Sequence, residues 1–333
     1  MTKLFTSDPL IAQPYRGYAN DHRIFLKGRV LEDEGIFRGK SKYLLRNLLD
    51  SFKRFESDEM PGAKVGVRLD ENYFEIITDH EGYFTLDMDW QSPPKPSENR
   101  WLKADVQLLD APGGLKETHL TEAEILFPSR NATYGIISDI DDTVLQTHVS
   151  YRWKWKLIYA TFFLGAHQRL PMEGMPELLR AFEKGADGKR ENPIFYVSDS
   201  PWNIFDLLVE FMALQQLPKG AILLRDVGMP PKIRPEGYRG HKLDSIGQIL
   251  KTFPELPFIM LGDTASKDAD YYLTLAQEFS NRIVAIYIRQ TRDTANARRV
   301  ATLIEGSSNI NAVLVRSSKE ILEHAARHGF LSS

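Results

Sequence analysis

The first part of the chain, up to about residue 130, alternates apolar and polar positions with a period of two. Clear examples are the stretches 65–69, 84–88 and 102–108. This alternation is typical of strands that bury one face. Leucines and phenylalanines at helical spacing between residues 41 and 56 interrupt it and predict one helix. We therefore expect residues 1–130 to form a β-rich, sandwich-like domain with one inserted helix.

From residue 131 onward the pattern changes to short apolar runs separated by amphipathic stretches. The runs are YGIIS, PIFYV, GAILL, PFIML, RIVAIYI and NAVLV. Apolar strands that alternate with helices are typical of a parallel sheet covered on both faces. The predicted fold class is therefore α/β: a doubly wound parallel sheet over residues 131–333, preceded by the sandwich-like N-terminal domain. Ligands of such a sheet gather at the carboxyl ends of its strands.

Composition and charge exclude several classes of protein. The 333 residues are 42% hydrophobic and 26% charged, which is typical of a folded globular protein. Lys and Arg number 42 against 45 Asp and Glu, so the net charge of −3 provides no basic field and nucleic acid is not an expected partner. The chain has no cysteine, which excludes thiolate catalysis and cysteine-ligated metals. No apolar stretch has the length of a signal peptide or a membrane span, so we expect a cytoplasmic protein.

The first apolar run of the second domain leads directly into the acidic segment Asp139-Ile140-Asp141-Asp142-Thr143. Because side chains alternate along an extended chain, Asp139 and Asp141 would point the same way. Two such acids can divide the roles of nucleophile and general acid/base if a cation relieves their repulsion. A capped loop or an ordinary acidic turn is the alternative.

Polar residues also follow two other predicted elements. Ser198 ends the run PIFYVS, where its hydroxyl could donate to a phosphoryl oxygen or cap the helix that begins at Pro201; we expect Ser200 to be the cap and Ser198 the ligand contact. Lys242 begins a helix and shares the positive end of its dipole, which a nearby anion would offset. The alternative for Lys242 is a solvated surface lysine.

The run PFIMLGD places Asp263 directly after an apolar strand and Asp268 at the start of the next helix. The helix dipole by itself accounts for an acid at the position of Asp268. Carboxylates from Asp139, Asp141 and Asp263 would suit Mg²⁺, which binds hard oxygen ligands alongside a phosphate. The sequence therefore predicts a magnesium site.

The order of these motifs resembles that of the haloacid-dehalogenase-like (HAD) phosphatases over about 200 residues. More narrowly, the strings DIDDT, YVSDSPWN, LLRD and GDTASKD are similar to the catalytic domain of App1-type phosphatidate phosphatases. The SPWN string after Ser198 is the specific part. That family tends to have Gly-Asp-Ser and a Pro-Glu pair at the last motif, where this chain has Thr264, Ala269 and Asp270.

The resemblance implies a role for each motif residue. Asp139 would be the nucleophile and a metal ligand, and Asp141 the general acid/base, which also offers its backbone carbonyl to the metal. Ser198 and Lys242 would hold the phosphoryl oxygens. Asp263, helped by Asp268, would complete the Mg²⁺ site. The implied activity is a Mg²⁺-dependent phosphomonoester hydrolase that acts on phosphatidate or a related lipid phosphate through an aspartyl-phosphate.

The insertion near 145–172 is too short to fold a large cap over the site, and an open cleft favours a bulky substrate such as a lipid head group. Within it, residues 151–164 interleave basic and aromatic side chains, which suits peripheral contact with a membrane. The alternative is a helix that packs its aromatic residues on the core.

Two other functions stay open at this point. The same chemistry could act on a soluble or protein phosphoester. A receiver-like module or scaffold without turnover would also combine acids, a hydroxyl and a lysine. However, a receiver needs no acids after its lysine, and Asp263 and Asp268 both follow Lys242. Their position favours turnover.

Overall fold

The computed structural model describes residues 9–32, 60–94, 100–115, 119–140, 174–226, 236–291 and 294–332. The chain divides into two compact units, residues 1–127 and 128–333. That each unit is an independent domain stays a prediction. Several predicted features lie outside the described residues: the helix between 41 and 56, Asp141, and the insertion 145–172 with its basic and aromatic segment 151–164.

The described strands of the first unit belong to one eight-stranded sheet. They are β1 (Leu10–Pro14), β2 (Gly17–Ala19), β3 (Arg23–Glu32), β4 (Lys64–Leu69), β5 (Asn72–Ile77), β6 (Tyr83–Asp89), β7 (Trp101–Asp110) and β8 (Leu120–Leu126). The order is β1-β3-β2-β8-β7-β4-β5, with β6 paired to β3. β5 also contacts β6 and β1 contacts β7, although neither pair is adjacent in this order, so the sheet curls. The N-terminal sheet region is confirmed, while its likeness to a two-sheet sandwich stays a prediction.

The core of this unit follows the alternation seen in the sequence. Val65, Val67 and Val106 are fully buried and belong to one apolar cluster. Between β5 and β6, the side chain of Asp79 accepts hydrogen bonds from the backbone N–H groups of Glu81 and Tyr83, both at 2.9 Å. This turn joins two strands whose inner faces supply part of the cluster.

Among the described residues, the second unit has a six-stranded sheet in which all pairings are parallel. Its strands are β9 (Gly135–Asp139), β10 (Ile194–Pro201), β11 (Ala221–Arg225), β12 (Phe258–Asp263), β13 (Ile283–Arg289) and β14 (Ala312–Val315). Its described helices are α4 (Met175–Lys184), the 3₁₀ helix η2 (Trp202–Ile204), α5 (Phe205–Leu214), α6 (His241–Thr252), α7 (Asp268–Glu278), α8 (Thr294–Glu305) and α9 (Ser318–Arg327). All six predicted apolar runs are strands of this sheet, and the predicted α/β class is confirmed.

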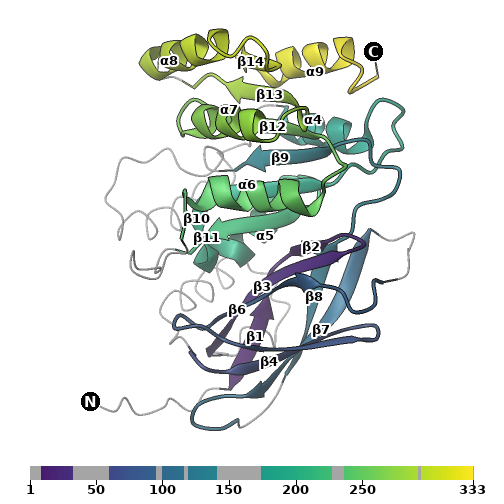
Figure 1. Ribbon diagram of the computed structural model, residues 1–333, viewed down its shortest axis with the longest axis vertical. Helices are drawn as coiled ribbons and strands as arrows, with labels where there is room; N and C mark the ends of the chain where they lie inside the picture. The colour runs from purple at the N-terminus through teal and green to yellow at the C-terminus, as the bar shows by residue number, and fades with distance from the viewer. Residues whose placement is uncertain are drawn as a thin grey trace. The chain divides into compact units, whose positions relative to one another are not determined.

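The strand order is β11-β10-β9-β12-β13-β14 (Figure 1). Numbered along the chain within this unit, the order is 3-2-1-4-5-6, which reverses direction between β9 and β12. Ligands of open parallel sheets bind at such a switch point, beyond the carboxyl ends of the strands. Helix α6 packs on β10 and β11, α7 packs on β12 and β13, and α6 and α7 contact each other. Helices α4 and α9 also contact each other.

None of the described helices is long and apolar enough to cross a membrane.

Candidate active site

The switch point brings Asp139 and Asp263 to the same edge of the sheet. Asp139 is the last residue of β9 and Asp263 the last residue of β12, and these two strands are neighbours. Strand β10, on the other side of β9, pairs Val197 with Asp139, so Ser198 follows one residue beyond Asp139 on the adjacent strand. Three of the predicted site residues therefore lie together at the carboxyl edge of β9, where its pairing with β10 and β12 ends.

Lys242 lies at the centre of a charged cluster that it forms with Asp139, Asp263 and Asp268. Its side chain is 1% exposed, and its ammonium nitrogen lies 2.9 Å from Oδ1 of Asp139 and 2.9 Å from Oδ1 of Asp268. Lys242 is the second residue of α6, so the first turn of this helix directs it at the strand ends. The alternative of a solvated surface lysine is wrong. The carboxylates of Asp139 and Asp268 stabilise this cation, although it lies at the positive end of the α6 dipole.

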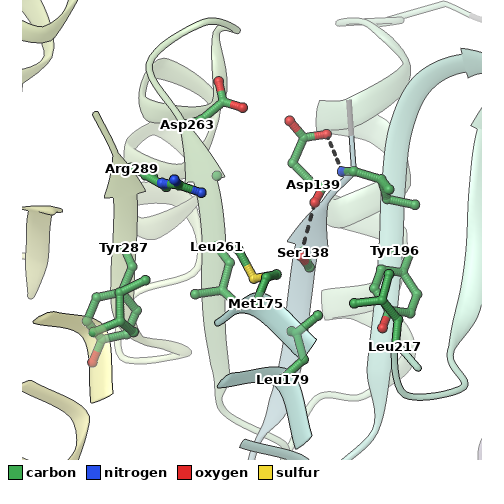
Figure 2. Close-up of a pocket in the computed structure, with 13 residues that line it drawn as sticks. Ser138, Asp139, Met175, Leu179, Tyr196, Leu217, Leu261, Asp263, Tyr287 and Arg289 are labelled. Carbon is green, nitrogen blue, oxygen red and sulfur yellow. Dashed lines mark hydrogen bonds between the residues drawn. The ribbon is translucent and has the colours of Figure 1, made fainter. Parts of the chain in front are cut away.

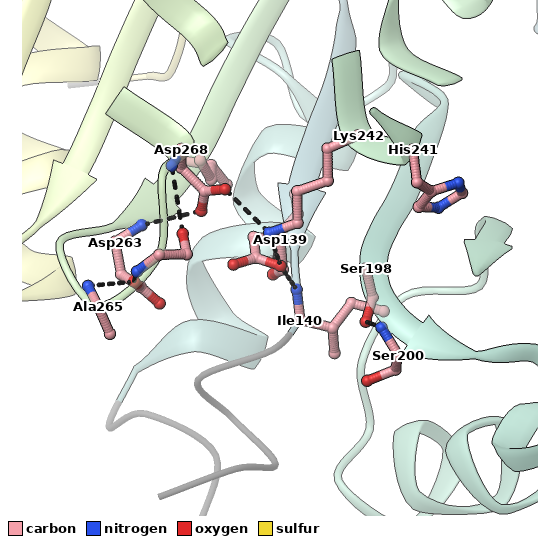
Figure 3. A network of polar contacts seen from close by, with 12 residues as sticks. Asp139, Ile140, Ser198, Ser200, His241, Lys242, Asp263, Ala265 and Asp268 are labelled. Atoms are coloured by element: carbon pink, nitrogen blue, oxygen red, sulfur yellow. Dashed lines mark hydrogen bonds and ion pairs between the residues drawn. The ribbon is translucent and has the colours of Figure 1, made fainter. Parts of the chain in front are cut away.

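The loop between β12 and α7 holds the other two acids. Oδ1 of Asp263 accepts hydrogen bonds from the backbone N–H groups of Ala265 at 2.7 Å and Ser266 at 3.1 Å. Oδ2 of Asp268 accepts one from the backbone N–H of Asp263 at 3.3 Å. Both acids are buried, and Figure 3 shows them beside Asp139 and Lys242. The turn after β12 thus fixes both carboxylates against the cluster.

The donor set of this cluster fits a divalent cation. One carboxylate oxygen from each of Asp139, Asp263 and Asp268 lies within 4.8 Å of the other two. Three carboxylates around one lysine leave net negative charge in a buried place, which a bound cation would offset. Oxygen ligands of this kind suit Mg²⁺. Asp141, the fourth predicted ligand, lies outside the described residues.

Ser198 is 1% exposed, and its hydroxyl oxygen accepts a hydrogen bond from the backbone N–H of Ser200 at 2.9 Å. The prediction that Ser200 caps the following helix is wrong. Strand β10 continues through Pro201, which itself occupies the N-cap position of η2, and no side chain caps that helix. The pairing of β10 with β11 is irregular between Val197 and Pro201, and the extended chain there keeps Ser200 in the strand.

A buried tyrosine links the helix that begins at Asp268 to the strand that ends at Asp263. The hydroxyl of Tyr272, on α7, donates a hydrogen bond to the carbonyl oxygen of Leu261 at 3.1 Å. Burial, together with the negative charges of Asp268 and Asp139, raises the pKa of Tyr272 well above its ordinary value of 10.0. The phenol therefore stays protonated, and it ties α7 to β12 just before Asp263.

A cavity adjoins the acids on the face of the sheet that α4 and α9 cover (Figure 2). The cross-strand row Tyr196, Ser138, Leu261 and Tyr287 lines it. Arg289, the last residue of β13, also lines it and pairs in register with Asp263. Arg289 is not among the site residues predicted from the sequence. The signal was present, since Arg289 follows the apolar run RIVAIYI just as Asp263 follows PFIMLG.

Gly262 is required by the packing of Asp268. A Cβ added at Gly262 would lie 2.6 Å from both Cβ and Oδ2 of Asp268. We expect Gly262→Ala to displace Asp268 from Lys242 and to lower the free energy of unfolding by about 1–3 kcal/mol. Urea denaturation measures this change. Gly306→Ala is the control, because a Cβ there meets its nearest atoms at an ordinary 3.5 Å. Equal urea midpoints for the two variants would contradict the expected steric clash between a Cβ at residue 262 and Asp268.

The fold and the site define this second unit as an α/β domain with a buried carboxylate–lysine cluster at its topological switch point. Residues 134–290 match the family model described as the catalytic domain of phosphatidate phosphatase APP1. This match confirms the resemblance to the App1-type catalytic domain that the motifs predicted.

Two curated proteins are similar to the chain. Phosphatidate phosphatase APP1 of Saccharomyces cerevisiae is 31% identical over 198 residues, which are 58% of this chain and 32% of that protein. The uncharacterised protein C29B5.04c of Schizosaccharomyces pombe is 25% identical over 256 residues, or 74% of this chain and 40% of that protein. The chain thus spans less than half the length of either relative. A solved carbohydrate acetylesterase from Xanthomonas citri aligns at 10% identity over 97% of this chain and 75% of its own, with a TM-score of 0.35, too low to support an argument.

Proposed function

We propose that this chain is a Mg²⁺-dependent phosphomonoester hydrolase with a HAD-like catalytic domain, and that it acts on phosphatidate or a related lipid phosphate. The observation that carries the proposal is the buried ammonium of Lys242, 2.9 Å from both Asp139 and Asp268, at the switch point of a parallel sheet. The similarity to yeast phosphatidate phosphatase supports the lipid substrate. The chain's cytoplasmic location and a peripheral contact with membranes are parts of the same proposal.

In the proposed reaction, a carboxylate oxygen of Asp139 attacks the phosphorus atom of the ester. The new bond from Asp139 to phosphorus forms as the ester P–O bond breaks, and the leaving alcohol oxygen takes a proton from Asp141. Water then gives a proton to Asp141 and attacks the phosphorus of the aspartyl-phosphate. The bond to Asp139 breaks, inorganic phosphate leaves, and the carboxylate is restored.

The arrangement of the described residues supports this proposed reaction. The first turn of α6 fixes Lys242, so its ammonium can stabilise negative charge on the phosphoryl oxygens without reorganisation. Ser198, on β10, lies one residue beyond the register position of the proposed nucleophile Asp139 on β9. This place suits a hydroxyl that orients the phosphoryl group. Asp139 and Asp263, with Asp268 beside them and the predicted ligand Asp141, would hold Mg²⁺, which supplies positive charge when bound.

The test is a release assay for inorganic phosphate over three substrates: phosphatidate in mixed micelles, a soluble aryl phosphate and a phosphopeptide. We expect turnover of phosphatidate in Mg²⁺, loss of activity in excess chelator and recovery with Mg²⁺ but less with Ca²⁺, whose looser coordination tolerates non-productive geometry. Full activity in excess chelator would contradict the metal dependence.

The same assay separates the alternatives. Turnover of the aryl phosphate or the phosphopeptide without turnover of phosphatidate would replace the lipid substrate with a soluble or protein phosphoester. A phosphoryl label that stays on the protein and is not released would instead favour a receiver-like module.

A further inference from the structure

The cavity beside Asp139 combines an apolar wall with one cation. Its described lining includes Met175 and Leu179 from α4, Ile321 from α9 and the cross-strand row named above. Arg289 is the only cationic side chain among the described residues that line it. Figure 2 shows Arg289 reaching from β13 toward β12, next to Asp263 and at the level of Asp139.

Arg289 and Lys242 approach the site from opposite faces of the sheet. Tyr287 and Arg289 are two residues apart on β13, so their side chains share the face that α4 and α9 cover. Asp139 follows Ser138, which lies on that face, and points to the other one, where it meets Lys242 from α6. A group held at Asp139 would therefore have one cation on each side.

The charges around Asp139 show why a second cation matters. Asp139, Asp263 and Asp268 carry three negative charges, and the single positive charge of Lys242 is shared between two of them. A divalent cation would offset the remainder, but a phosphate monoester brings up to two further negative charges to the same place. Because Arg289 is half-buried at the edge of the cluster, its charge acts where water screens it only partly.

We propose that Arg289 binds a phosphoryl oxygen of the substrate, from the side of the sheet opposite Lys242. A guanidinium suits this task, since its planar donors bind phosphate in a bidentate manner. The inference rests on the proposed phosphatase function, of which it names a further substrate-binding residue. The competing role for Arg289 is structural: it would position Asp263, its register partner, as a metal ligand.

The test measures binding of inorganic phosphate and of Mg²⁺ to the full chain by calorimetry, with phosphate binding measured in Mg²⁺. We expect Arg289→Gln to weaken phosphate binding at least about tenfold, as for the loss of a charged hydrogen bond, while the affinity for Mg²⁺ stays the same. Arg289→Lys keeps the charge but loses the bidentate geometry and should be intermediate. Arg298→Gln, at an exposed position on α8, is the charge-matched control and should bind phosphate like the wild type.

Two results would overturn the proposal. Unchanged phosphate affinity in Arg289→Gln would show that the guanidinium does not contact phosphate. A parallel loss of Mg²⁺ and phosphate affinity would assign Arg289 to the positioning of Asp263. If Arg289→Gln does not fold, the comparison is made with Arg289→Lys, for which an unchanged phosphate affinity together with an unchanged KM has the same consequence.

Turnover by the wild-type chain tests the proposed function separately from the role of Arg289. Wild-type protein that binds phosphate through Arg289 but hydrolyses none of the three substrates would refute the hydrolase and leave the anion site. Wild-type protein that hydrolyses phosphatidate, with the same KM and phosphate inhibition in Arg289→Gln, would refute only the role of Arg289.

Discussion

Asp139→Asn is expected to reduce the release of inorganic phosphate by about a thousandfold or more. The amide is a poor nucleophile, so neither the bond from residue 139 to phosphorus nor the acyl-phosphate can form. Asparagine is close in size to aspartate and keeps one oxygen that can accept the hydrogen bond from the N–H of Ile140, now 2.7 Å from Oδ1. The fold should therefore survive, and the measurement is kcat together with acid-quench trapping of labelled phosphate on the protein.

The control for this variant is Asp187→Asn, which removes one carboxylate from an exposed position. Asp187 pairs with Arg190 at 2.9 Å in the loop that precedes β10, before the amino end of that strand, whereas the site lies at the carboxyl ends. We expect wild-type activity from it. Labelled phosphate trapped on Asp139→Asn would show that the nucleophile is another residue. Retained turnover in Asp139→Asn would contradict a covalent mechanism through Asp139.

Much of the second unit could be predicted from the local pattern of the sequence. Strands of a parallel sheet are buried on both faces, so each of the six gives an unbroken apolar run, and their carboxyl ends mark where polar residues converge. That rule found Asp139, Ser198 and Asp263. The same rule also marks Arg289, the last residue of β13.

Other features depend on contacts that the local pattern does not contain. A lysine at the start of a helix is usually exposed, and only the approach of β9 and α7 to α6 buries Lys242 between two acids. In the same way, the Ser-Pro pair at residues 200 and 201 is typical of a helix start. The pairing of β10 with β11 outweighs this preference and keeps Ser200 extended.

Lys242→Met is expected to lower the free energy of unfolding by roughly 3–5 kcal/mol, because it removes one partner of a buried ion pair and leaves the carboxylates uncompensated. Methionine fills a similar volume, so the lost charge rather than a cavity is responsible. The urea midpoint at neutral pH should fall by roughly 1 M or more. Lys251→Met is the matched control, since Lys251 lies on the same helix and is exposed.

The proposed metal site makes this loss of stability depend on Mg²⁺. In the wild type, Lys242 already offsets part of the charge of Asp139 and Asp268, whereas in Lys242→Met a bound cation is the main remaining source of positive charge for these acids. Saturating Mg²⁺ should therefore raise the urea midpoint of Lys242→Met more than that of the wild type or of Lys251→Met. Equal midpoints for the two lysine variants without metal would show that the ion pairs contribute little to stability. An equal response of all three proteins to Mg²⁺ would contradict the proposal that Lys242 and the cation offset the charge of the same carboxylates.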